Sequence, residues 1–116
     1  MTPDVNVLLA AFRPDHPQHE IALACVRAGL SGVATGRSFV LLPMVVAGFL
    51  RLATHARVFR EPAPSQAAVA YIDSLLAVPG VEIAELGREW RSLRRLMLEH
   101  SASGNDVPDA WIAPAV

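Results

Sequence analysis

Apolar residues near the start of the chain form a short cluster that runs into a helical pattern. Residues 3–5 predict a short strand, and residues 6–12, which are mostly apolar, predict the first turns of a helix. That helix should end where Arg13 precedes Pro14, because proline disfavours helical backbone in the residue before it. The chain is therefore predicted to open with a strand that leads directly into a helix.

A second helix is predicted to open at Pro17, since proline fits the first turn of a helix. Glycine often follows the last turn, so we expect this helix to stop at Gly29 or Gly32. Its apolar positions, which we expect to face the core, are Ile21, Leu23, Ala24, Val26 and Leu30.

The rest of the chain continues to alternate between short apolar runs and helical patterns. It predicts a buried strand at 38–42, an apolar helix from Pro43, a proline-bracketed helix within 61–80, a strand at 81–83 and an amphipathic helix at 88–104. Short apolar strands between helices, with little alternation of period two, are typical of a parallel sheet covered by helices. We therefore predict an α/β fold with a short parallel central sheet flanked by helices.

The composition fits one compact domain that spans residues 1–116. Of the 116 residues, 53% are hydrophobic, so the chain is long enough to bury a core. It shows no apolar run that could span a bilayer and no signal-peptide pattern, which favours a cytoplasmic protein without a membrane partner. A mean hydropathy of +0.35 is high for a monomer of this size, so we expect residues 44–50 or 70–76 to form an apolar patch that meets another copy or a partner.

Charge and the other reactive side chains give weaker signals. The formal net charge is −1, so the overall charge does not indicate a nucleic-acid binder. Cys25 lies in an apolar helical stretch, where a buried thiol is the expected role. We expect His16 and His19 to be surface residues, because no third soft ligand accompanies them. Arg51 lies on an apolar helix and should pair with an acid at the edge of the core. Contact with a substrate phosphate or an antitoxin carboxylate is the alternative.

Asp4 raises the first question of chemistry, because it lies beside a very apolar segment. An unpaired buried carboxylate is costly, so this acid must be solvated, paired or bound to a metal. Ligands of open α/β sheets collect at the carboxyl ends of parallel strands, where the predicted first strand places Asp4. Acids that converge there would form an oxygen site suited to Mg²⁺ or Mn²⁺. A loop acid without a ligand is the other interpretation of Asp4.

The segment GNDVPDAWIA holds the second pair of acids, Asp106 and Asp109. Asp106 could be a helix N-cap, with Pro108 in the first turn and Asp109 completing a capping-box-like pair. By spacing alone, capping is the more frequent use of such acids. Metal binding is the alternative, with Asp4 as the partner, and the spacing does not decide between them.

Three stretches together make the chain similar to PIN-domain ribonucleases, and more narrowly to the VapC toxins of bacterial VapBC toxin–antitoxin pairs. They are DVNVLLAAFRPDHPQH, LLPMVVAGFLRLATHARVF and ASGNDVPDAWIA, in this order over nearly the whole chain. The resemblance implies that Asp4 and Asp109 are metal ligands and that Asn6 orients Asp4 by hydrogen bonding. Asp106 is a further candidate ligand.

The resemblance also implies an activity and partners. It implies Mg²⁺-dependent endonucleolytic cleavage of RNA, of the tRNA or ribosomal RNA class, with Mn²⁺ as a substitute ion. It further implies a homodimer and a cognate VapB-like antitoxin that inserts a segment into the active-site groove. A metal held by carboxylates suits this chemistry, because it stabilises charge on the reacting oxygens and lowers the pKa of bound water.

Three departures from the family pattern lower the expected activity. Gly48 stands where many members carry a ligating Glu, and the last strand or strands of the family, with a further acid, are missing before Val116. Pro114 also falls within the last predicted helix, where proline costs about 3 kcal/mol. We therefore expect weak or absent nuclease activity from residues 1–116. A binding module for antitoxin or RNA, and a small receiver-like signalling domain, are the alternatives.

Overall fold

The computed structural model describes residues 1–84 and 88–100. Its elements are α1 (Val5–Phe12), α2 (His19–Val33), β1 (Phe39–Leu41), α3 (Pro43–Ala53), α4 (Ser65–Leu76), β2 (Val81–Ile83) and α5 (Arg88–His100). Within the described residues the sheet has two strands, which pair in parallel with Phe39 opposite Val81. The predicted α/β fold with a short parallel sheet is confirmed.

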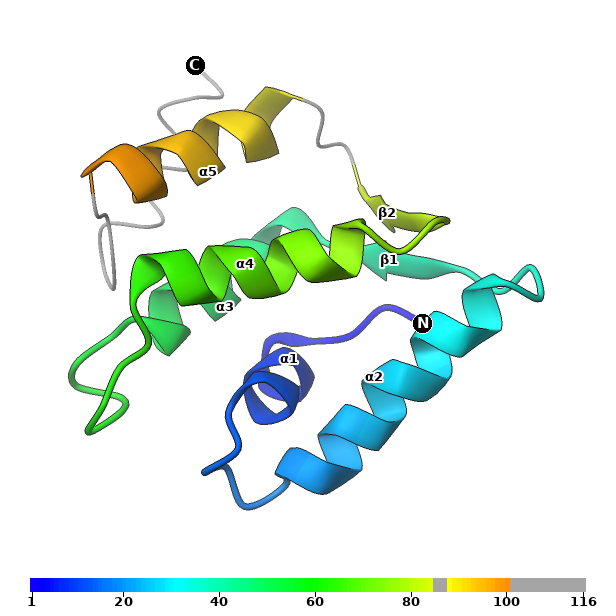
Figure 1. Cartoon of the computed structure of the whole chain (residues 1–116), viewed down its shortest axis with the longest axis horizontal. Helices are drawn as coiled ribbons and strands as arrows, with labels where there is room; N and C mark the ends of the chain where they lie inside the picture. Colours follow the sequence, from blue (N-terminus) through cyan, green and yellow to red (C-terminus); the bar gives the residue numbers. More distant parts are fainter. Residues whose placement is uncertain (85–87, 101–116) are drawn as a thin grey trace.

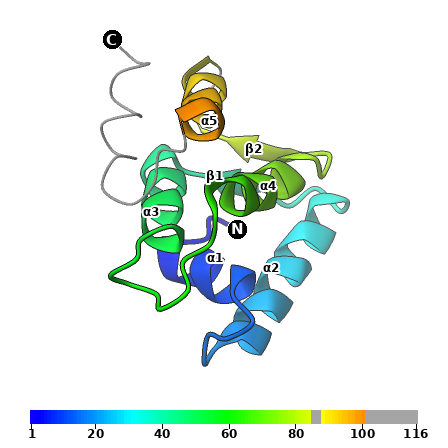
Figure 2. The ribbon, with the colours of Figure 1, turned by 60° about the vertical axis from the view of Figure 1, so that its left-hand side comes forward.

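The helices form a stack with the sheet at one end. In Figure 1, α4 lies in the middle, with α1 and α2 on one side of it and α5 on the opposite side. Figure 2 shows α3 beside α1. β1 contacts α2, and β2 contacts α4. None of the helices in the described ranges has the length and apolar character needed to cross a membrane.

The strand predicted at residues 3–5 is wrong, and Met1 alone pairs with the sheet in this part of the chain. The Met1 amino group donates to the Ser38 carbonyl, and the Met1 carbonyl accepts from the Val40 N–H at 2.9 Å. Met1 thus bonds to Ser38 and Val40, the residues on either side of Phe39, which is the hydrogen-bond pattern of two parallel strands. The N-terminus therefore lies next to β1, on the edge away from β2 (Figure 1).

Asp4 explains why the expected strand does not continue. Its Oδ1 accepts a hydrogen bond from the Val7 N–H at 2.9 Å, which caps a helix that begins at Val5. The helical pattern therefore starts one residue earlier than predicted. It ends at Phe12, as expected from the proline that follows Arg13.

Gly29 lies inside α2, so the predicted stop at Gly29 or Gly32 is wrong. A Cβ at position 29 would overlap Met1 Sδ and would lie 3.1 Å from the ring of Phe39. The missing side chain therefore lets α2 pack closely on β1 and the N-terminal residue. The helix continues through Gly32 to Val33.

The core contains side chains from all five helices and from β1. The largest fully buried residues are Leu8, Phe39, Leu41, Val46, Phe49, Leu50, Val69, Ile72, Leu93 and Met97. Beside them the rings of Phe12, Phe49 and Tyr71 pack with centroids 5.2–5.4 Å apart, so one aromatic cluster joins α1, α3 and α4. The Tyr71 hydroxyl is buried there and has no hydrogen-bond partner among the described residues.

Arg13 joins the loop after α1 to the loop before α4. Its side chain is 10% exposed, and its Nε and Nη2 donate to the Asp15 carboxylate at 3.0 and 2.9 Å. Nη2 also donates to the Glu61 carbonyl at 3.0 Å, and the guanidinium lies 3.9 Å from the centroid of the Phe59 ring. The hydrogen bond from Arg13 lowers the pKa of Asp15.

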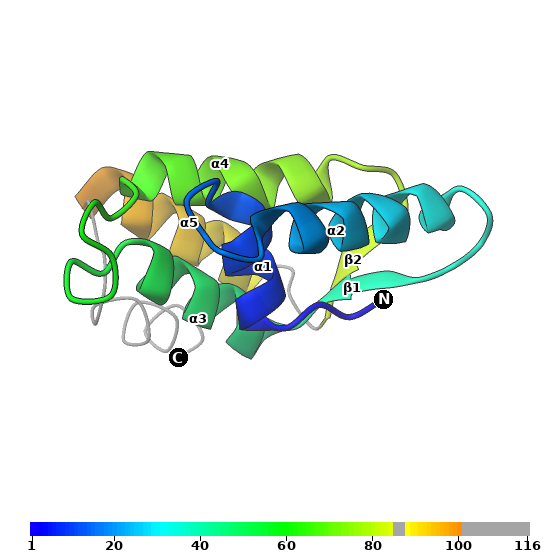
Figure 3. The ribbon, with the colours of Figure 1, turned by 90° about the horizontal axis from the view of Figure 1, so that it is seen from below.

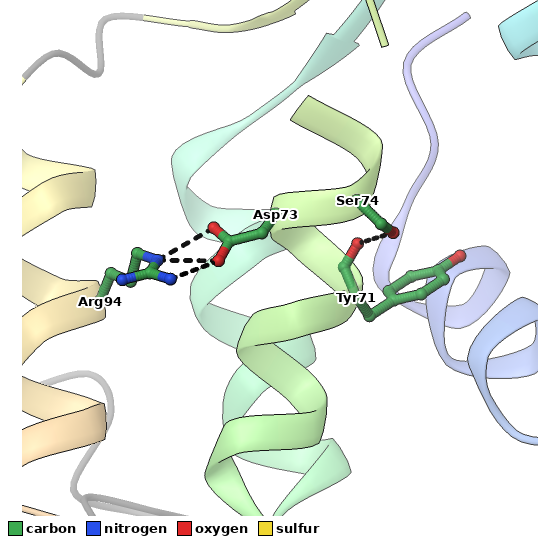
Figure 4. Close-up of polar contacts among 4 residues, drawn as sticks. All are labelled: Tyr71, Asp73, Ser74 and Arg94. Carbon is green, nitrogen blue, oxygen red and sulfur yellow. Dashed lines mark hydrogen bonds and ion pairs between the residues drawn. The ribbon is translucent and has the colours of Figure 1, made fainter. Parts of the chain in front are cut away.

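A second ion pair joins α4 to α5. Arg94 Nε donates to both oxygens of Asp73, at 3.0 and 2.8 Å, and Nη2 donates to Oδ2 at 2.6 Å (Figure 4). Asp73 and Tyr71 point to opposite sides of α4, so this helix faces α5 with an acid and the aromatic cluster with a ring. Unlike Arg13, the Arg94 side chain is 42% exposed.

We predict that the two arginines contribute unequally to stability. Arg13→Ala should lower the free energy of unfolding by about 2 kcal/mol, because it removes charge-assisted bonds and a ring contact from a buried side chain. Arg94→Ala should cost less than about 1 kcal/mol, since an exposed ion pair is screened by water. Urea unfolding of the two variants measures the difference. Equal losses would contradict the burial-based ranking.

Burial of Tyr71 yields a second prediction. Tyr71 is the only tyrosine of the chain, so a tyrosine titration reports this residue alone. Burial raises the pKa of Tyr71 to about 12, from 10.0. The contribution of Tyr71 to the free energy of unfolding is therefore fully present below pH 10, and it is lost as the pH rises through about 12. A tyrosinate absorbance titration should show the raised midpoint. Tyr71→Phe should raise the free energy of unfolding by about 1 kcal/mol, because it removes an unsatisfied hydroxyl, and a loss of stability would refute this.

Candidate functional site

A groove of about 460 Å³ lies between α1 and α2. Figure 3 shows these two helices side by side. Polar side chains and apolar side chains both line the groove. The lining residues are Asp4, Asn6, Val7, Ala10, His16, Pro17, Gln18, Ile21, Ala22 and Cys25. The groove therefore brings together two of the predicted site residues, Asp4 and Asn6, from the N-terminus and first turn of α1.

Asp4 keeps much of its ligating capacity in this position. One carboxylate oxygen accepts from the Val7 N–H, and within the described part of the chain Oδ2 has no bonding partner. The side chain is exposed and lies at a helix N-terminus, where the backbone dipole favours negative charge. Capping and ligand binding are thus compatible at Asp4, because they use different oxygens. Asn6 is also exposed, with its amide at the same groove.

The other predicted ligands, Asp106 and Asp109, lie outside the described residues. Across residues 1–84 and 88–100, no group of three or more histidines, cysteines or acids is close enough to hold a metal ion. Asp4 is therefore the one predicted ligand that lies within the described residues. A carboxylate and an amide in a groove form a partial oxygen-ligand set, which needs further ligands to hold a cation firmly.

Gly48 on α3 lies next to the start of α1. A Cβ at this position would be 3.0 Å from Val5 Cγ2, and Val5 directly follows Asp4. The glycine therefore allows α3 to pack closely on the first turn of α1. Position 48, where many relatives of the PIN type were expected to carry Glu, is near the candidate site in space.

The sequence interpretation of α2 needs correction at three positions, one of which is Ala24, expected to face the core but exposed. Cys25, expected in the core, is exposed and lines the groove. Ile21 was also expected to face the core, yet it is 76% exposed and lines the same groove. The reason is that α2 packs through Ala22 and Val26, whose small and branched side chains fit the close contact with α1.

His16, in the α1–α2 loop, and His19, the first residue of α2, have more specific roles than the expected surface positions. The His19 ring lies 2.8 Å from the Ala10 carbonyl through Nδ1, and this bond ties the start of α2 to α1. His16 lines the groove together with Asp4 and Asn6. Its position directly after the helix that carries these two residues was the signal that sequence reasoning missed.

The apolar patch predicted at residues 44–50 is exposed only in part. Met44 is 87% exposed and Leu42, just before α3, is 40% exposed, whereas Phe49 and Leu50 are fully buried. In residues 70–76, Ile72 is buried and no large apolar side chain is exposed, so this second candidate patch is wrong. Arg51 lines a hollow of about 240 Å³ beside Met44 and forms no ion pair with any described residue, so the predicted core-edge pair is not found there.

Sequence comparison finds close relatives among mycobacterial ribonucleases. Ribonuclease VapC43 of Mycobacterium tuberculosis is 40% identical over 112 residues, which cover 95% of this chain and 74% of that protein. Ribonuclease VapC31 of the same organism is 40% identical over 112 residues, or 95% and 76% of the two chains. Ribonuclease VapC25 of this organism is 40% identical over 109 residues, which cover 92% of this chain and 74% of that protein. The chain belongs to the VapC ribonuclease family.

Membership of the VapC family agrees with the observed architecture. The parallel strands between helices match the PIN-type α/β fold that the sequence resemblance implied. The VapC43 and VapC31 relatives align over 95% of this chain. No family model matches the chain.

Proposed function

We propose that this chain is the toxin of a type II toxin–antitoxin pair and acts as an Mg²⁺-dependent endoribonuclease on RNA of the tRNA or ribosomal RNA class. The observation that carries the proposal is the exposed Asp4 carboxylate, which stands in a groove with a free oxygen. The family relationship adds the reaction class, since the relatives are named ribonucleases. The groove has the volume of an ordinary ligand pocket.

The residues of the groove fit a hard divalent cation. Mg²⁺ is commonly held by one or two carboxylates, with water and substrate phosphates completing its shell. Asp4 would hold the ion, and we propose Asp109 as the second ligand, with Asp106 as a further candidate. Asn6 is proposed to orient the Asp4 carboxylate. When bound, the ion supplies Lewis acidity and a water of lowered pKa; Mn²⁺ should substitute.

The chain's own residues would position the RNA around that carboxylate. The Val7 N–H fixes one Asp4 oxygen, which leaves the other directed to a ligand. The apolar wall, which includes the exposed side chains of Ile21 and Cys25, offers a surface on which apolar parts of a substrate can pack. Both features favour a substrate that presents a phosphate to the ion at Asp4 and an apolar surface to α2.

We further propose a cytoplasmic homodimer that is inhibited by a VapB-like antitoxin. The exposed side chains of Leu42 and Met44 support a contact with a second copy, because large exposed apolar groups mark interaction sites. The groove offers an antitoxin segment the same carboxylate and apolar wall that it offers RNA.

One observation favours a second candidate, a PIN domain that binds RNA or antitoxin without cutting. Gly48 lacks a carboxylate at a position beside the site, so the ion would have fewer ligands than in relatives with Glu there. Weaker metal binding should slow cleavage. We therefore expect slow turnover at most from residues 1–116, and the two candidates differ in whether Asp4 is needed for toxicity.

Asp4→Asn should separate these candidates without disturbing the fold. Asn caps helices as well as Asp does, so the Val7 bond persists and the unfolding midpoint should stay unchanged. Loss of the charge should abolish Mg²⁺-dependent RNA cleavage to the level seen in EDTA, and should abolish growth arrest on expression. Growth arrest that is equal in Asp4→Asn and the natural chain would instead support the binding module.

Gly48→Glu should strengthen Mg²⁺ binding several-fold in isothermal titration calorimetry, because it adds a carboxylate on α3 next to Val5, the residue that follows Asp4. Gly48→Gln is the matched control. It has the same size and the same Cβ contact with Val5, but no charge. If the two variants bind Mg²⁺ equally, the placement of position 48 in the metal site is refuted.

A further inference from the structure

His16 is held on three of its four hydrogen-bonding groups. Its N–H donates to the Arg13 carbonyl at 3.0 Å, and its carbonyl accepts from the His19 N–H at 3.0 Å. Its ring Nδ1 accepts from the Gln18 N–H at 3.0 Å. Among the described residues, Nε2 is the group of His16 that has no partner.

The bond from Gln18 fixes the chemical state of the ring. A nitrogen that accepts a hydrogen bond carries no proton, so Nδ1 of His16 is unprotonated. In the neutral imidazole the proton is then on Nε2. While this bond persists, the ring is neither an imidazolium acid nor a base at Nε2. It is a neutral donor with one N–H to offer.

We propose that His16 is an RNA-binding residue, whose Nε2–H donates to a phosphate oxygen of RNA lying in the α1–α2 groove. The inference rests on the proposed ribonuclease function. It adds a binding residue from the α1–α2 loop to the acids that hold the metal. His16 shares the groove with Asp4 and Asn6, so RNA that reaches Asp4 passes within the same cavity of about 460 Å³.

The loop that carries His16 is built to hold the ring in place. Arg13, at the start of the loop, binds Asp15 and the Glu61 carbonyl, and it is almost fully buried. His19, at the end of the loop, is bonded to α1. A donor on a loop fixed at both ends loses little conformational freedom when it binds a ligand.

A phosphate oxygen is the acceptor that fits this donor best. The described residues that line the groove include no arginine, so neutral hydrogen-bond donors would contact the RNA backbone beside the proposed metal ion. A bond to an ionised oxygen is about twice as strong as a bond between neutral groups. Phosphate and sugar also receive most of the hydrogen bonds that proteins make to nucleic acids.

His16→Asn tests the proposal, because the Asn oxygen replaces Nδ1 as the acceptor for Gln18 while the Nε2–H is lost. The readout is the affinity for a mixed-sequence single-stranded RNA, measured with Ca²⁺ in place of Mg²⁺ so that binding is observed without cleavage. The affinity should fall about ten- to a hundred-fold, the range for a hydrogen bond to a charged group. The urea unfolding midpoint should not change.

His55 provides a matched control. Its Nδ1 also accepts from the backbone N–H two residues later, that of Arg57 at 3.1 Å, but His55 is not among the residues that line the groove. His55→Asn should leave both RNA affinity and stability unchanged. Any loss of RNA affinity that is larger in His16→Asn than in His55→Asn is therefore due to the missing Nε2–H donor of His16.

The salt dependence tests the neutral state of the ring. A neutral donor displaces no counterion, so His16→Asn should lower RNA affinity equally at all salt concentrations. A slope of log affinity against log salt that falls by about 0.7 in the variant would identify a charged imidazolium and overturn the proposal. Unchanged RNA affinity in His16→Asn also overturns it, while the ribonuclease proposal stands. A natural chain that neither binds nor cleaves RNA overturns both.

Discussion

The hydrogen bond between the Val7 N–H and Asp4 Oδ1 is the contact on which the site depends. It starts α1 immediately after the N-terminal residues leave the sheet, and it uses only one oxygen of the carboxylate. The charge is therefore held at the mouth of the groove by the backbone of its own helix. Helix geometry then places Asn6 beside it, and the close contact at Gly48 sets α3 against the same turn.

Two ion pairs hold the elements around that turn. Arg13 fixes the α1–α2 loop against the loop before α4, which keeps the groove wall and His16 in place. Arg94 fixes α5 on Asp73 at the far side of α4 (Figure 4). α5 is the last described element before Asp106 and Asp109 in the sequence.

The sequence predicted best those elements whose boundaries depend on local chemistry. Pro43 opens α3, and 81–83 is a strand, as expected from proline preference and a short apolar run. Where tertiary contacts decide, the predictions were wrong. Gly29 allows a close approach to Phe39 and does not end a helix, and no local rule reveals that partner.

The candidate site, too, was predicted in part from the sequence. The family resemblance identified Asp4 and Asn6 by motif, and the structure adds that they share one groove. Helical periodicity could not show that Ile21 and Cys25 lie in that groove, because it gives the spacing of apolar residues but not the element that covers them. The roles of Asp109 and Asp106 remain predictions from the sequence.

The central claim is that carboxylates from the beginning and the end of the chain surround one divalent cation. A crystal structure of the chain grown with Mn²⁺, with the ion located by its anomalous scattering, tests it most directly. The account predicts one anomalous peak within bonding distance of both the Asp4 and the Asp109 carboxylates. Separate carboxylates on opposite sides of the molecule, with no peak at Asp4, would contradict it.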